Sequence, residues 1–209
     1  MARAAKPSKK LIAALQRHAE RRELIQLERA GLDERSIQGF VLAASEQLIV
    51  LQYVYDFLCD GLLALRTSDV SALRRSATDA LQQGMLQEAG ALAAVPFGQR
   101  FDVSDWPGLI GQWSQQWPLL VLECEAQQPP DFLIGQVLKV GRKKLRLRGF
   151  SGTARWWAPE RWRYADITCC QVGTRYIQAY QRYFEQHTPQ TWFAIRQRQR
   201  AAAMNHNSF

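Results

Sequence analysis

An internal duplication is the feature of this sequence that most limits its fold. The segment formed by residues 37–74 recurs, with partial identity, in residues 133–172. Similar segments at a fixed spacing indicate copies of one supersecondary unit, so we expect two domains with the same fold. The aligned positions are Gly39 with Gly135, at an offset of 96, and Asp69-Val70-Ser71 with Asp166-Ile167-Thr168, at an offset of 97.

Length and composition agree with two small domains. A chain of 209 residues accommodates two domains of about 100 residues each, a common domain size. The hydrophobic content of 47% and the charged content of 22% are typical of soluble globular proteins. No apolar run approaches the ~20 residues that span a bilayer, and no signal-peptide core follows the basic N-terminal residues. We therefore expect a cytoplasmic protein with no membrane partner.

Cysteine and histidine usage predicts no metal and no cofactor. Cysteines in apolar surroundings without a Cys-x-x-Cys pair are most simply interpreted as small buried hydrophobic residues. Cys169 and Cys170 are adjacent in a strand pattern, which would point one side chain to the core and the other outward. The other cysteines and the histidines are scattered along the chain: Cys59, Cys124, His18, His187 and His206.

The pattern of residues along the chain divides it into four segments. Residues 1–90 are predicted to hold a helix, a set of short strands and a closing helix, and residues 91–104 a connector. Residues 105–188 repeat the helix, the strands and the closing helix. Residues 189–209 are predicted to be a basic, flexible tail.

Each half begins with a helical pattern followed by short β-rich runs. Ser8 is a predicted N-cap of the first helix, and Asp60-Gly61 is predicted to form a tight turn between strands. Short apolar runs separated by turn residues are typical of a small antiparallel barrel. In the first half the predicted strands cover residues 24–29, 37–45, 47–54, 61–66 and 69–75.

This order of elements, with a glycine early in the second strand, resembles the Sm-like fold, a small SH3-like β-barrel. The resemblance implies a mainly β fold with flanking helices: two tandem Sm-like five-stranded antiparallel barrels, each preceded by a helix. The chain is also similar to uncharacterised bacterial proteins that carry two such barrels. The resemblance is carried by Gly39-Phe40-Val41, by Gly135-Gln136-Val137, and by the closing Asp-Val-Ser and Asp-Ile-Thr steps.

The chain lacks the residues with which Sm-type RNA binders hold a base. Those proteins use an Asp and an Asn in the turn after the second strand, together with an Arg-Gly step near the last strands. The family's RNA pocket and its ring assembly are therefore not carried over to this chain. The Asp-like positions here are Ser45 and Gly141, and the Asn-like positions are Ile49 and Leu145.

Enzymatic signals are nearly absent from the sequence. It has no phosphate-cradling Gly-rich loop, no Gly-x-Ser-x-Gly elbow and no His-Glu-x-x-His motif. Asp69 and Asp166 recur at matching positions, but an Asp before a strand more often fixes a turn than acts in catalysis. We therefore expect a non-enzymatic binding protein.

Positive charge is concentrated in the second half. Residues 105–209 carry 14 Lys or Arg and 7 Asp or Glu, whereas residues 1–104 carry 13 and 12. Such asymmetry favours a polyanionic or acidic partner. Arginines at 196, 198 and 200 would add sequence-independent attraction for phosphate.

A basic stripe followed by tryptophans is the one candidate recognition site. If Leu145 and Leu147 face the core, strand alternation sends the basic residues between and beside them outward. Cations along a strand with aromatic residues beside them suit the phosphates and bases of RNA or single-stranded nucleic acid. The candidate residues are Lys139, Arg142, Lys143, Lys144, Arg146, Arg148 and Arg155 for phosphate, and Trp156 and Trp157 for stacking.

Two interpretations of this stripe carry equal weight. It is either a nucleic-acid surface or the solvated face of a small barrel, where Lys and Arg also block edge pairing.

Residues 48–58 are apolar on both strand faces, which predicts burial on both faces and close packing of the two barrels or of a homo-oligomer. The alternative function is thus a protein–protein interaction or assembly module, and a weaker one is an anion-binding regulatory domain.

Overall fold

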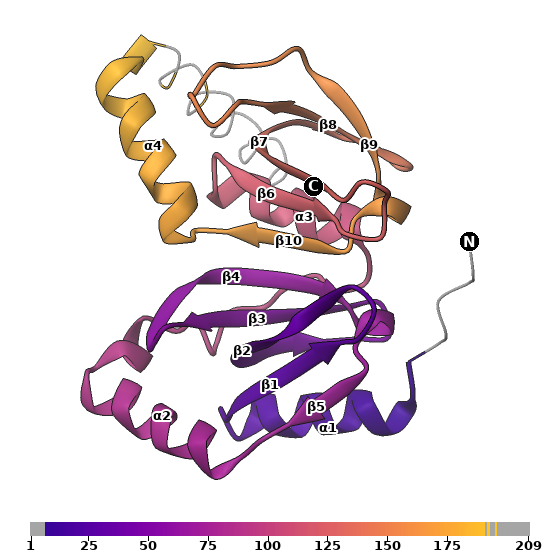
Figure 1. The fold of residues 1–209 in the computed structure, drawn as a ribbon, viewed down its shortest axis with the longest axis vertical. Helices are drawn as coiled ribbons and strands as arrows, with labels where there is room; N and C mark the ends of the chain where they lie inside the picture. Colours follow the sequence, from indigo (N-terminus) through magenta and orange to yellow (C-terminus); the bar gives the residue numbers. More distant parts are fainter. Residues whose placement is uncertain (1–6, 191, 193–194, 196–209) are drawn as a thin grey trace. The chain divides into compact units, whose positions relative to one another are not determined.

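The computed structural model describes residues 7–190, 192 and 195 (Figure 1). The chain divides between Asp105 and Trp106 into two compact units, here called the first and second unit. Antiparallel strands dominate both, and four α-helices accompany them in the described residues. The predicted mainly β fold with flanking helices is therefore confirmed. The predicted tail, apart from its first few positions, lies outside the described residues.

The first unit follows the predicted order of helix, strands and helix. The Ser8 side chain accepts a hydrogen bond from the backbone N–H of Leu11 at 3.1 Å, so the predicted N-cap is confirmed. The helix then packs against the second strand and buries Leu15. The elements are α1 (Lys9–Glu20), β1 (Leu24–Arg29), β2 (Asp33–Ala44), β3 (Leu48–Tyr55), β4 (Leu58–Arg66), η1 (Thr67–Asp69), β5 (Ala72–Arg74), α2 (Ala77–Glu88) and η2 (Ala91–Ala94).

The second unit repeats this order. Its first helix buries Trp106, Leu109, Ile110 and Trp113, whose spacing along the sequence lies on one face of a helix. Its last helix begins after Thr174, whose side chain accepts from the N–H of Ile177. The elements are α3 (Trp106–Gln116), β6 (Leu120–Cys124), β7 (Asp131–Val140), β8 (Lys144–Gly149), β9 (Glu160–Arg163), η3 (Tyr164–Asp166), β10 (Cys169–Val172) and α4 (Arg175–His187).

Strand order is the same in both units. The order is β5-β1-β2-β3-β4 in the first unit and β10-β6-β7-β8-β9 in the second, which is fifth, first, second, third, fourth in each. In the described part of the chain, no ladder within a unit joins its fourth strand to its fifth. Backbone pairing therefore does not close either sheet, and the predicted barrel closure is not confirmed.

Each of the two aligned glycines allows a close approach between the second and third strands of its unit. Gly39 in β2 lies against β3 so closely that a Cβ would collide with the carbonyl oxygen of Gln52. Gly135 in β7 lies in the same way against the carbonyl oxygen of Arg148 in β8. The second strand of each unit can approach its neighbour at this point only because glycine has no side chain.

A β-bulge follows each glycine at the same distance. The register between the second and third strands shifts between Val41 and Ala43 in the first unit, and between Val137 and Lys139 in the second. A bulge inserts one extra residue and bends its strand. The turns that follow are closed by hydrogen bonds from Ser45 N to Leu48 O at 2.9 Å and from Gly141 N to Lys144 O at 3.1 Å.

The aligned aspartates fix equivalent turns, as predicted, but through arginine side chains. Asp69 accepts a hydrogen bond from the Nε of Arg66 at 2.7 Å, and Asp166 accepts one from the Nε of Arg163 at 2.7 Å. Each ion pair spans a single 3₁₀ turn, η1 or η3, directly before the fifth strand. The duplication thus extends to side-chain contacts.

The predicted turn at Asp60-Gly61 is wrong. The hairpin between β3 and β4 turns at Asp56 and Phe57, which have φ angles of 49° and 59°. Gly61, with a φ of 70°, lies inside β4 where the register with β3 shifts. The Asp-Gly pair therefore forms a bulge, and Gln52 Nε2 secures it by donating to the Gly61 carbonyl at 2.8 Å.

Cys124, Cys169 and Cys170 are buried and Cys59 is partly buried, as expected of small hydrophobic residues, with one correction. Cys169 and Cys170 are 2% and 0% exposed, so the expectation that one of them faces outward is wrong. Because β10 is buried on both faces, alternation along it does not separate a core side from a solvent side. Burial, with the nearby Glu123 carboxylate, holds the pKa of the Cys170 thiol far above its ordinary value.

The prediction that residues 48–58 are buried on both faces is confirmed for residues 48–52 of β3 and is wrong at the hairpin end, where Tyr55, Phe57 and Leu58 are 57%, 51% and 45% exposed. Residues 48–52 are all at most 5% exposed, although their side chains alternate between the two sides of the sheet. One core cluster of the first unit joins β1, β2 and β3 to α2, and η2 packs against it. That core contains Leu24, Phe40, Val54 and Leu86, with Ala91, Leu92 and Phe97 packed against it.

A buried carboxylate, which the sequence analysis did not single out, fastens α2 to the sheet. Asp79 is fully buried and completes a capping box with Ser76. One of its oxygens accepts from the Nε2 atoms of Gln26 and Gln38 at 2.9 Å each, and the other from the N and Oγ of Ser76. Burial disfavours the charge, but these bonds outweigh it and hold the pKa of Asp79 below its ordinary value.

We predict that Gly39→Ala and Gly135→Ala each lower the free energy of unfolding by about 1–3 kcal/mol, because the added Cβ forces two backbones apart. Gly84→Ala is the control: nothing lies within 4 Å of its Cβ position on α2, so it should be neutral or stabilise by up to ~1 kcal/mol. Urea unfolding measures all three. Wild-type stability of the first two variants would contradict the close approach.

We predict that Asp79→Asn lowers the free energy of unfolding by about 1–3 kcal/mol at neutral pH, because an amide has only one acceptor oxygen where four hydrogen-bond donors converge. Because the pKa of Asp79 is lower in the folded than in the unfolded protein, its ionised carboxylate stabilises the fold at pH values above the unfolded pKa. This stabilisation is lost as the pH falls through the folded pKa. The difference in the free energy of unfolding between wild type and Asp79→Asn should therefore become smaller in acid. If the difference in the free energy of unfolding stays constant from neutral pH to pH values below 3.8, the ordinary pKa of an aspartate, the ionised Asp79 carboxylate does not stabilise the fold in this way.

Candidate nucleic-acid interface

Strand β8 has the alternation that the sequence predicted. Leu145 and Leu147 are both 0% exposed, whereas Lys144 and Arg146 are exposed on the opposite side of the sheet. Residues two apart on a strand are about 7 Å apart, similar to the phosphate spacing of an extended nucleic-acid strand. The basic residues of β8 therefore lie in a line on one surface.

The neighbouring strands widen this line into a surface. Arg146 lies directly opposite Lys139 of β7 and directly opposite Arg161 of β9. Lys144 lies opposite Arg163 of β9. We call Lys139, Lys144, Arg146, Arg161 and Arg163 the basic face.

Arg161 and Arg163 were not among the site residues predicted from sequence. They reach the basic face because the ladder between β8 and β9 pairs Leu145 with Trp162. Ten residues, 150–159, separate these two strands, so no local pattern indicates their register. The density of basic residues around Arg161 was the only available clue.

Most of the basic face carries no compensating acid. Among the described residues, Lys139, Lys144, Arg146 and Arg161 make no ion pair. Only Arg163 is neutralised, by Asp166 at 2.7 and 2.9 Å. Like charges directly opposite each other on a sheet are destabilising, so this face contains unrelieved repulsion.

Four of the predicted phosphate contacts lie outside the basic face, three of them in turns and the fourth, Arg148, against a tryptophan. Arg142 and Lys143 are exposed at the tip of the turn between β7 and β8. Arg155 is exposed in a separate turn, where its carbonyl accepts from Ser151 N at 2.9 Å. These residues extend the positive region along the loops but are not aligned with the strand rows.

Arg148 and Trp156 have structural contacts. The guanidinium carbon of Arg148 lies 5.2 Å from the ring centroid of Trp156, a cation–π contact. The Trp156 ring also packs on Phe150 at 5.0 Å and on Phe184 at 4.9 Å between centroids. Trp156 therefore belongs to the edge of the core, with Arg148 on top of it.

Trp157 is the exposed member of the tryptophan pair. Its side chain is 45% exposed, while its backbone N–H donates to the Gly149 carbonyl at 2.8 Å. The two tryptophans thus differ in burial. Trp157 is the one of the two whose ring is accessible for stacking.

Comparisons of the chain with protein-family models, with curated proteins and with solved structures found no match. In the part of the chain that the structure describes, no helix is both long and apolar enough to cross a membrane.

We predict that Arg146→Gln raises the free energy of unfolding at low salt by about 0.2–1 kcal/mol, because it relieves repulsion with both neighbours. The gain should disappear at high salt, where the charges are screened. Urea unfolding at two salt concentrations measures this, with Arg142→Gln at the turn tip as a control without a cross-strand partner. A loss of stability at low salt would mean that Arg146 is not repelled in the folded protein.

Proposed function

We propose that the chain is a cytoplasmic, non-enzymatic binding protein whose second unit contacts RNA or another single-stranded nucleic acid through the basic face. One observation carries this proposal. The row formed by Lys139, Arg146 and Arg161 crosses three adjacent strands, and none of the three makes an ion pair with a described acidic residue. A polyanion lying across this row would offset the repulsion that the folded unit contains by itself.

The duplication gives this row an internal control. The equivalent row of the first unit is Ala43, Val50 and Ala64, paired by the same ladders after the same bulge. The fold therefore accommodates apolar residues at these positions, and three aligned cations are not required by the architecture. Their presence in the second unit alone supports a role in binding.

We also propose that each unit is a small barrel of the Sm-like or SH3-like type. The shared strand order, the equivalent glycines and bulges and the paired Arg–Asp turns support this proposal. The Asp-like and Asn-like positions hold Ser45, Gly141, Ile49 and Leu145, which do not supply the base-binding groups of Sm-type proteins. Binding would therefore depend on phosphate contacts made by the basic face, with Trp157 available for stacking.

A protein–protein interaction or assembly role is the second candidate, and a different surface favours it. The β3–β4 hairpin of the first unit exposes Tyr55, Phe57 and Leu58 at 57%, 51% and 45%. Its turn holds Phe57 at a positive φ, an uncommon conformation for a bulky side chain. An exposed apolar tip of this kind suits a protein surface, including that of a second copy in a homo-oligomer.

We predict that the triple variant Lys139→Gln, Arg146→Gln, Arg161→Gln binds a short oligoribonucleotide at least about tenfold more weakly than wild type. The slope of log affinity against log salt should become shallower by about 2, since each phosphate contact on a single strand contributes ~0.7. Fluorescence anisotropy of a labelled oligonucleotide, with nuclease-treated protein, measures both quantities.

The matched control removes the same charge from the first unit through Lys9→Gln, Lys10→Gln, Arg17→Gln on the exposed side of α1. This variant should keep most of the affinity. Equal losses in both variants would show that net charge, and not the basic face, attracts the nucleic acid. Absence of binding by wild type at low salt would end the nucleic-acid proposal and leave the hairpin tip as the surface to pursue.

A further inference from the structure

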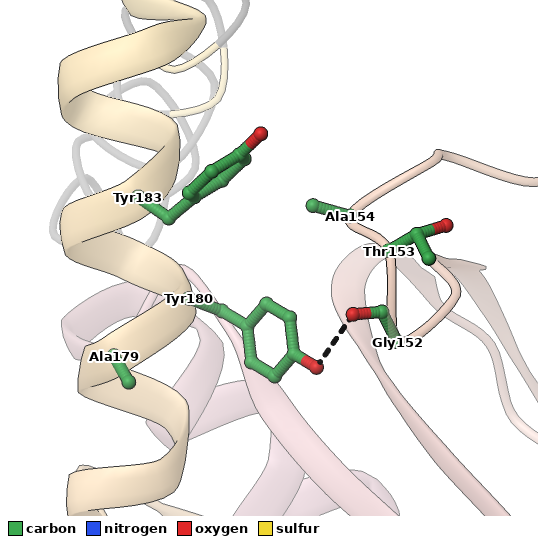
Figure 2. Close-up of a pocket in the computed structure, with 6 residues that line it drawn as sticks. All are labelled: Gly152, Thr153, Ala154, Ala179, Tyr180 and Tyr183. Carbon is green, nitrogen blue, oxygen red and sulfur yellow. Dashed lines mark hydrogen bonds between the residues drawn. The ribbon is translucent and has the colours of Figure 1, made fainter.

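The second unit contains a cleft that the basic face does not include (Figure 2). It has a volume of about 270 Å³ and lies between α4 and the turn that follows β8. Figure 2 shows the rings of Tyr180 and Tyr183 projecting from α4 toward this turn. The lining residues are Gly152, Thr153, Ala154, Ala179, Tyr180 and Tyr183.

The turn wall of the cleft is held in one shape. The N–H of Ala154 donates to the Ser151 carbonyl at 2.8 Å, and the N–H of Arg155 donates to the Ser151 Oγ at 3.2 Å. Ala154 has a φ of 58°, in the left-handed region, which directs the chain back toward Trp156. The amide N–H groups of Gly152 and Thr153 donate to no protein group in the described residues, so they remain available to a ligand.

The helix wall of the cleft is aromatic and fixed in orientation. The Tyr180 hydroxyl donates to the Gly152 carbonyl at 3.2 Å, and its ring packs on Phe150 at 5.0 Å. The Tyr183 ring is stacked on one face by His187, at 4.3 Å between centroids and 14° between planes. A ring covered on one face and 44% exposed overall is a platform for a second planar ring.

The electrostatic surroundings of the cleft are positive. Arg155 directly follows the wall residue Ala154, and Arg182 directly precedes Tyr183. Both arginines are exposed, and neither makes an ion pair among the described residues. The acid nearest in sequence, Glu185, accepts hydrogen bonds from Trp192 Nε1 at 2.9 Å and from Gln181 Nε2 at 3.4 Å. An anionic group on a ligand would therefore meet two arginines without ion pairs and one carboxylate at this end of the unit, a net positive charge.

We infer that this cleft binds one nucleobase together with its adjoining phosphate. The planar ring stacks against Tyr183, the free amides of Gly152 and Thr153 donate to the polar edge of the base, and Arg155 or Arg182 neutralises the phosphate. The volume is below the roughly 300–1,000 Å³ of sites for larger ligands, which suits one ring system.

The ligand has two sources with the same chemistry. The base belongs either to a nucleic-acid strand that lies on the basic face or to a free nucleotide. The first case rests on the proposed function, and the second is independent of it. Both sources use the same stacking platform and the same cations, so cleft variants test them together.

The test fills the cleft without touching the core. Ala179 is exposed on α4 and lines the cleft, so Ala179→Leu places an isobutyl group in the ligand's volume. Gln178→Leu is the control for an isobutyl group elsewhere on α4: it places one at an exposed position that does not line the cleft, in exchange for a side chain of similar size whose Nε2 donates to the Gly173 carbonyl at 2.8 Å. Tyr183→Ala removes the platform, and Tyr183→Phe keeps the ring. Circular dichroism and thermal unfolding establish that each variant is folded.

Two probes separate the two sources. The first is the set of four ribonucleoside 5′-monophosphates, titrated calorimetrically. The second is an oligouridylate, compared by anisotropy with an abasic oligonucleotide of the same length. We expect Ala179→Leu and Tyr183→Ala to weaken mononucleotide binding by about 5- to 150-fold, the effect of losing one stacked base, while Tyr183→Phe and Gln178→Leu bind like wild type.

For the oligonucleotide, wild type should prefer the base-bearing strand to the abasic one, and Ala179→Leu should abolish that preference without changing the salt slope. If the oligonucleotide binds equally well to wild type and to Ala179→Leu, and mononucleotides do not bind, the cleft is not a base site although the proposed function stands. If only mononucleotides bind, and the cleft variants abolish this, the inference stands and the proposed function fails. If neither probe binds, both are overturned.

Discussion

The close approach of two backbones at Gly39, and again at Gly135, determines what each sheet presents on its surface. Beyond each glycine the second strand bends through a bulge, and the bulge changes the pairing by one residue. Without it, Leu138 would lie opposite Arg146; with it, Lys139 does. A one-residue shift exchanges the two faces of a strand, so the bulge is what brings a third cation into the basic row.

The two units show how one fold separates stability from recognition. Their glycines, bulges and Arg–Asp turns are equivalent, and these are the features that hold the strands in register. The rows beside the bulge differ completely, with Val50 fully buried in the first unit where Arg146 is exposed in the second. Because the backbone tolerates either kind of residue there, those positions are free to carry binding chemistry.

Local patterns predicted the features that depend on neighbouring residues. The cap at Ser8 and the burial of Leu145 and Leu147 follow from spacing within a few positions, and the structure confirms them. The pattern failed where long-range pairing decides the outcome. Asp60-Gly61 has the composition of a turn, but pairing between β3 and β4 places the turn four residues earlier and makes Gly61 a bulge. The β9 arginines and the cleft depend on contacts that no short window contains.

The basic face and the cleft would contribute to binding in different ways. Strand cations such as Arg146 attract phosphates of any sequence, and their attraction weakens steeply with salt. The cleft is defined by shape, by the Tyr183 ring and by two free amides, which salt affects little. Under the proposed function, the strand rows would give affinity and the cleft would give preference for one base over another. A chain without the Sm-type base pocket would thereby recover selectivity at a different place in the same unit, between its last helix and the turn after β8.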